Sequence, residues 1–173
     1  MTSISEFTRD ARAVRMVLSM LTEPDDAVTG RLLGRLCAVK TVGLLDGGGK
    51  LPGLGRVDAQ VWHDWLTTAA RPDELAGCLR HTEAAGIGVV IPGDRDWPAA
   101  LTDLSEREPF VLWTRGAASF LSRPFTDLLT ITGSRAATSH GECVAAEFAT
   151  DVAHDGRVIV AGTGSRAPPA APL

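Results

Sequence analysis

LLTITGSRAATSHGECVAAEFATDVAHDGRVIVAG, residues 128–162, holds the pattern that decides the fold. Its first five residues are an apolar run, typical of a strand that is covered on both faces of a parallel sheet. A glycine turn follows, and Ser139 and Glu142 have the spacing of a capping box, so we expect a helix to begin near Ser139. The apolar stripe of this helix consists of Val144, Phe148 and Val152. Gly156 is suited to end the helix, and RVIVAG, residues 157–162, predicts a second strand. Strand, helix and strand form a βαβ unit, the opening of a doubly wound sheet.

The turn between the first strand and the helix has features of an anion site. Backbone N–H groups at a helix start have no intrahelical partner, and the helix dipole adds partial positive charge there. Gly133 would let a ligand approach the backbone, while Ser134 and Thr138 offer hydroxyl donors. Arg135 would give a phosphate a planar charged fork, and Gly141 would permit close packing of helix on strand. The turn is neither GxGxxG nor GK[ST], so a phosphate site and an ordinary turn with a solvated arginine both stay open.

Composition and charge restrict the class of protein. The chain of 173 residues is 45% hydrophobic and 22% charged, as is typical of folded domains. Its net charge of −4 excludes a broadly basic surface, so any anion site must be local. Three widely spaced cysteines indicate reduced, mostly buried thiols. The chain shows no secretory leader and no apolar run of about 18 residues, so we expect a cytoplasmic protein without membrane insertion.

The N-terminal half of the chain predicts helices. Helical spacing of apolar residues indicates one helix within residues 6–22, a second over 28–39 and a short third segment over 42–45. A loop then leads into a helix that carries residues 57–65, and a further helix is predicted over 72–85.

Short apolar runs at residues 87–92 and 109–116 predict strands. We therefore expect an α/β protein with a helical region over residues 1–85 and the opening of a doubly wound sheet within residues 86–162. Three prolines in the last six residues indicate an extended or disordered tail over 163–173.

Three motifs in this order resemble the DNA-processing protein A (DprA, or Smf) family. They are GDRDWPAALTDL at 93–104, EPFVLWTRG at 108–116, and the stretch 128–162. The segment RMVLSMLTEPDDAVTGRLLGRL, residues 15–36, is similar to the helical region of actinobacterial members. The resemblance covers about residues 10–162, and the ordered set is more specific than any single motif.

The resemblance implies a bacterial cytoplasmic protein that binds single-stranded DNA and assists loading of the RecA recombinase during natural transformation. It implies binding without established catalysis, no cofactor, and a homodimer in full-length members. It also implies that residues 1–85 resemble a sterile alpha motif or a helix-hairpin-helix, and that residues 86–162 are the first part of an extended Rossmann, doubly wound domain. Carried over by position, Gly133, Ser134 and Arg135 form the family's GSR turn, where DNA phosphates are expected. Thr138 and Gly141 support that turn.

The chain departs from the family pattern after Gly162. The family continues with an SGxAxGID motif, an AH pair and several more strands and helices, whereas this chain reads TGSRAPPAAPL over residues 163–173. We therefore expect an incomplete Rossmann domain, with a tail that arose from a frameshift or a truncated gene. Exposed strand edges would lower stability and favour aggregation or oligomerisation. A chain that has lost its function by truncation is therefore an alternative to the family's function.

Other interpretations compete at several positions. The hairpin of a helix-hairpin-helix would fit LPGLGRVDA, residues 51–59, although glycine and proline mark plain loops as well. His140 and Cys143 are one helical turn apart, but two ligands are too few for a metal site. Ser134 and Ser139 lack a visible base partner for nucleophilic catalysis. Four tryptophans could stack on DNA bases or pack in the core: Trp62, Trp65, Trp97 and Trp113. Core packing is favoured, because they sit on apolar faces or at strand ends.

A function from another class is a nucleotide-metabolite sensor or hydrolase of the wider Rossmann superfamily. Such a protein would use the same helix start for a small phosphate ligand.

Overall fold

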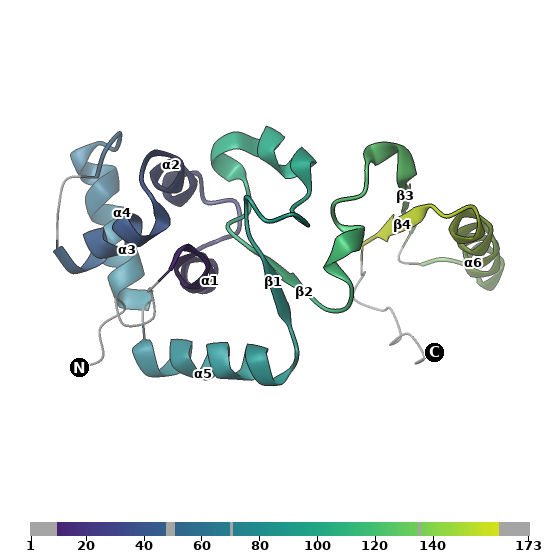
Figure 1. Ribbon diagram of the computed structural model, residues 1–173, viewed down its shortest axis with the longest axis horizontal. Coiled ribbons are helices and arrows are strands. Elements are labelled where there is room, and N and C mark those ends of the chain that lie inside the picture. The colour runs from purple at the N-terminus through teal and green to yellow at the C-terminus, as the bar shows by residue number, and fades with distance from the viewer. Residues whose placement is uncertain (1–9, 48–50, 70, 135, 163–173) are drawn as a thin grey trace. The chain divides into compact units, whose positions relative to one another are not determined.

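The computed structural model describes residues 10–47, 51–69, 71–134 and 136–162. It divides into two compact units, Met1–Ser122 and Arg123–Leu173. The first unit combines helices with a two-stranded hairpin, and the second contains two strands and a helix (Figure 1). This is the expected mixed α/β composition, with helices first and short strands after them.

The first unit is mostly helical. Its elements are α1 (Ala11–Leu21), α2 (Ala27–Arg35), α3 (Ala38–Gly47), α4 (Arg56–Ala69), α5 (Pro72–Ala84), β1 (Gly88–Val90), the 3₁₀ helix η2 (Ala99–Arg107), β2 (Leu112–Thr114) and the 3₁₀ turn η3 (Ala118–Phe120). Aspartates cap the first two helices: the Asp10 carboxylate accepts the Ala13 N–H at 2.8 Å, and Asp26 accepts the Thr29 N–H at 3.1 Å.

The single helix predicted over residues 28–39 is wrong, because α2 and α3 are separate. Leu36 has an extended backbone (φ −119°, ψ 154°), and its N–H makes the last bond of α2, to the Leu32 carbonyl at 2.8 Å. The apolar period runs across this break without a glycine or proline, so the pattern alone does not reveal it.

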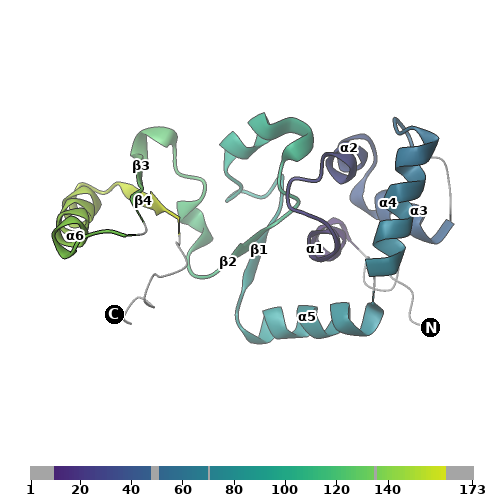
Figure 2. The same cartoon turned by 180° about the vertical axis from the view of Figure 1, so that it is seen from behind.

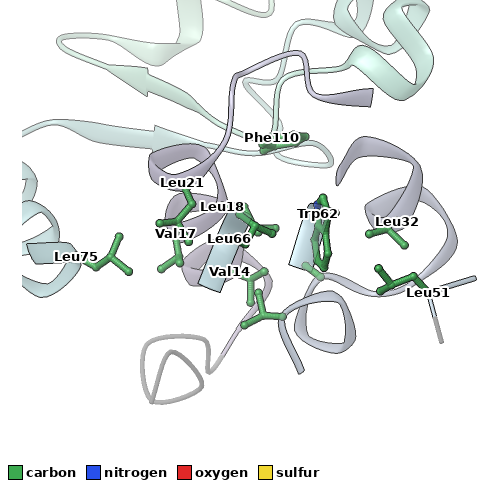
Figure 3. Packing of buried hydrophobic residues seen from close by; sticks show 12 residues of the cluster. Val14, Val17, Leu18, Leu21, Leu32, Leu51, Trp62, Leu66, Leu75 and Phe110 are labelled. Carbon is green, nitrogen blue, oxygen red and sulfur yellow. The ribbon is translucent and has the colours of Figure 1, made fainter. Parts of the chain in front are cut away.

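The helices of the first unit share one hydrophobic core. Figure 3 shows Trp62 and Leu66 of α4 among side chains of α1 and α2, with Phe110 close by. The buried cluster consists of Val14, Val17, Leu18, Leu21, Leu32, Ala38, Val42, Leu51, Trp62, Leu66, Leu75 and Phe110. Trp62 also donates from Nε1 to Thr29 Oγ1 at 2.8 Å, so its one polar atom is satisfied inside the core.

The β-hairpin of the first unit is tied to α1. β1 pairs antiparallel with β2, with Val89 opposite Trp113. Arg12 donates to the Val89 carbonyl at 2.7 Å and to Asp94 Oδ1 at 2.8 Å, and Asp94 Oδ2 accepts the Ile91 N–H at 2.9 Å. The hydrogen bonds from Arg12 and from the Ile91 N–H hold the pKa of Asp94 below its usual value.

The second unit has the predicted order of strand, helix and strand. It comprises η4 (Phe125–Asp127), β3 (Leu128–Ile131), α6 (Ser139–His154) and β4 (Val158–Ala161). β3 and β4 are parallel, with Leu129 opposite Ile159, and α6 lies beside them (Figure 2). Gly156 ends the helix with φ +78°, which confirms its predicted left-handed conformation.

The prediction that the first strand of this unit is covered on both faces is wrong in the described part of the chain. Leu128, Leu129 and Ile131 are only half-buried, and Val144 and Phe148 of the helical stripe are exposed, whereas Val152 is buried. In the described part of this unit a single α-helix, α6, packs against the two strands, and one helix can cover only one face of the sheet.

Three further expectations meet different outcomes. All three cysteines are exposed, so the prediction of mostly buried thiols is wrong: the cysteine positions are not on the core-facing sides of their elements. The predicted tail over 163–173 lies outside the described residues, and the division into domains at 85/86 stays a prediction. Among the described residues, no helix is long and apolar enough to cross a membrane.

Candidate nucleic-acid interface

The turn between β3 and α6 is open to solvent. Its described residues from Thr132 to Glu142 are all exposed. The N-cap of α6 is Thr138, which has an extended backbone (φ −79°, ψ 157°) and accepts the Gly141 N–H on its Oγ1 at 3.2 Å. The capping box predicted from Ser139 and Glu142 is therefore wrong by one residue, because Ser139 is already helical.

Ser134 organises the other end of the turn. Its Oγ accepts the Ala136 N–H at 3.2 Å, so this hydroxyl is already used as an acceptor while its proton remains available to a ligand. A Cβ added at Gly133 would have no atom within 4 Å, which leaves the backbone there approachable. Arg135, the predicted phosphate fork, lies outside the described residues.

The start of α6 offers a modest positive potential. Among the described residues, no hydrogen-bond acceptor faces the N–H groups of Ser139 and His140, which are free for an anion. Glu142 in the first turn opposes a bound anion. Gly141 does not serve close packing on a strand, because an added Cβ would meet only Thr138 Oγ1, at 3.5 Å. The geometry thus needs a cation from elsewhere in the turn, which Arg135 is predicted to supply.

Two other kinds of site were considered at this turn, a metal site and a catalytic serine. Among the described residues, no group of three or more His, Cys, Asp or Glu side chains is placed to hold a metal ion. His140 is exposed, and the Cys143 thiol donates to Glu147 Oε1 at 3.6 Å. No described base contacts the hydroxyl of Ser134 or Ser139.

Residues 51–55 form a turn immediately before α4. Leu51 is buried in the core, the Leu54 N–H bonds to the Leu51 carbonyl at 3.3 Å, and Gly53 has φ +81°. The left-handed conformation favours glycine there, and the Arg35 guanidinium group lies where a Cβ would stand. This geometry suits a plain loop and a DNA-gripping hairpin equally, so both interpretations stay open.

The tryptophans divide between core and surface. Trp62 and Trp97 are buried, as favoured by the sequence, whereas Trp65 and Trp113 are exposed. Trp97 also donates from Nε1 to Glu108 Oε1 at 3.0 Å, so the middle of the GDRDWPAALTDL motif is bonded to the first residue of the EPFVLWTRG motif.

A pocket beside β1 was missed from the sequence. Its volume is about 390 Å³, and Arg12, Asp94, Arg95, Asp96 and Thr114 are among its lining residues. Because the two arginines and the two aspartates give the pocket no net charge, its charge does not favour a phosphate ligand. The motif GDRDWPAALTDL, which contains Asp94, was visible in the sequence, but nothing in the local pattern around Arg12 marks Arg12 as the partner of Asp94.

Fold and turn together define a mixed α/β protein with an exposed helix start of the kind that binds anions. The family model described as DNA recombination-mediator protein A matches residues 88–165, which include this turn. Residues 88–165 thus carry a domain of the DNA recombination-mediator protein A family, the DprA family that the motifs resemble. No curated protein and no solved structure matches the chain.

Proposed function

We propose that this chain binds single-stranded DNA at the turn between β3 and α6 and assists loading of the RecA recombinase. The observation that carries the proposal is the match to the DNA recombination-mediator family over the segment that contains this turn. The proposed contacts are Gly133, Ser134 and Arg135, with Thr138 and Gly141 holding the helix start in place.

The physical argument supports a phosphate ligand in particular. The N–H groups of Ser139 and His140 point from the helix start, the Ser134 hydroxyl has a proton to donate, and the surrounding residues are exposed. Because the net charge is −4, binding depends on this local site and on its arginine.

The finer architecture belongs to the same proposal. We expect β3, α6 and β4 to be the opening strands and crossover helix of a doubly wound, Rossmann-type sheet, since they are parallel and joined by a helix. Cytoplasmic location and a homodimeric state are further expectations from the family.

The test is fluorescence anisotropy with a labelled oligo-dT across a range of salt concentrations. Arg135→Ala should weaken binding and reduce the slope of log affinity against log salt by about 0.7, the value for one phosphate contact on a single strand. Arg80→Ala is the matched control, because Arg80 is an exposed arginine of α5 in the other unit. An unchanged slope in Arg135→Ala would remove Arg135 from the site.

Calorimetry with nucleotides separates the rival function. Tight binding of a nucleotide with no binding of oligo-dT would replace the DNA proposal with a nucleotide-metabolite sensor or hydrolase. Absence of both would contradict either function for this chain.

A further inference from the structure

Helix α4 carries apolar residues on two different sides. Trp62 and Leu66 face the core of the first unit and are buried. Val57, Val61 and Trp65 recur every four residues on another side and are 75%, 63% and 48% exposed. Single exposed apolar residues are ordinary, whereas three in a row along one helix face indicate a contact surface. We call Val57, Val61 and Trp65 the outer stripe of α4.

Acidic residues border the outer stripe on both sides. At about 100° per residue, the three stripe residues span about 80° of the helix, and Asp64 and Asp58 each lie about 20° beyond one edge. Asp64 is exposed, accepts an amide hydrogen from Gln60 Nε2 at 2.8 Å and lies 3.6 Å from His63 Nδ1. Arg56, the first residue of α4, lies about 100° from Val57, outside this rim. Arg31 of α2 lies close enough to Asp58 for their charges to interact, so Asp64 is the less compensated of the two carboxylates.

We propose that the outer stripe of α4 binds an amphipathic helix of a partner protein whose apolar face is flanked by lysine or arginine. The apolar stripe supplies the contact area, and the rim of Asp58 and Asp64 selects positive flanks. Single-stranded DNA is disfavoured, because its phosphates would meet two carboxylates beside the exposed Trp65.

Copies of this chain do not supply that occupant. Two outer stripes facing each other would bring four carboxylates together. A second exposed apolar helix face in the described part of the chain, Val144 and Phe148 on α6, has Glu147 and Asp151 beside it, so it is acidic too. Charge complementarity thus points to a different protein.

The experiment uses the full chain and a synthetic helical peptide matched to the 14 residues of α4, with a leucine face flanked by lysines. A second peptide has glutamates in place of the lysines. Anisotropy should show about tenfold tighter binding of the lysine peptide. Val57→Ser with Val61→Ser should weaken that binding about tenfold, while Val144→Ser, an exposed valine of α6, should leave it unchanged.

A charge exchange tests the rim directly. Asp58→Asn with Asp64→Asn should reduce the preference for the lysine peptide over the glutamate peptide to about twofold or less. Asp58→Lys with Asp64→Lys should make the glutamate peptide bind more tightly than the lysine peptide. Equal affinity of the parent chain for both peptides would overturn the proposal. The proposal would also be overturned if the parent chain associates with itself or binds oligo-dT, and if Val57→Ser with Val61→Ser abolishes that association or binding.

Discussion

Gly30 lies in α2 where that helix meets η2, and replacing it with alanine should destabilise the first unit. A Cβ at this position would stand less than 2 Å from the Glu106 carbonyl oxygen and 2.9 Å from its carbon. Both atoms are backbone, so the helix or η2 must move by more than about 1 Å. Arg31 makes a two-pronged contact with Glu106, Nε to Oε1 at 2.9 Å and NH2 to Oε2 at 2.8 Å, and the same movement would disturb it.

The magnitude follows from two opposing effects. Alanine in place of glycine inside a helix stabilises it by about 1 kcal/mol, while overpacking costs about 1 to 3 kcal/mol. Because backbone cannot yield as a side chain does, we expect a net loss of about 1 to 2 kcal/mol for Gly30→Ala. Gly34→Ala, one turn along the same helix, has no atom within 4 Å and should instead stabilise by up to about 1 kcal/mol.

Urea unfolding followed by tryptophan fluorescence measures this difference. All four tryptophans lie in the first unit, and Trp62 bonds to Thr29, the neighbour of Gly30, so the signal reports on α2. Gly30→Ala as stable as the parent, or both variants shifting the midpoint in the same direction, would refute the steric reasoning.

Two further predictions concern α6 and pH. Thr138→Ala should weaken the start of α6 by about 1 kcal/mol and speed amide exchange in its first turn, whereas Thr138→Ser should retain the cap; equal exchange in both variants would contradict the capping role. The folded pKa values of Asp94, through Arg12, and Glu106, through Arg31, are lowered, so the stabilisation is complete above the ordinary values of 3.8 and 4.5 and lost as pH falls below them. Asp94→Asn should flatten the acid limb of stability against pH, and Asp103→Asn, which has no ion pair in the described part of the chain, should leave it as in the parent.

Local signals in the sequence predict most elements of the second unit. The continuous apolar run, the glycine turn and the amphipathic period place β3, α6 and β4 within one residue or two of their observed bounds. The N-cap was misplaced by one residue because Thr138 and Ser139 are both good caps, and only backbone geometry chooses between them.

Contacts between distant segments were not predictable in the same way. Arg12 and Asp94 are 82 residues apart, and Arg31 and Glu106 are 75 apart, so no local period relates them. Exposure of Val57, Val61 and Trp65 was hidden too, because a helix with two apolar faces looks the same in sequence whichever face is buried.

These long-range contacts bind the family-matched segment to the helices before it. Phe110, within residues 88–165, is 2% exposed in a core built mainly from helices α1 to α5. Two carboxylates of the same segment form ion pairs with these helices: Asp94 with Arg12 of α1, and Glu106 with Arg31 of α2. The helical region therefore supplies part of the core and charge partners of this segment, and removing it would leave Phe110 exposed and both carboxylates unpaired. The hairpin is therefore held in place by α1, and η2 is held in place by α2.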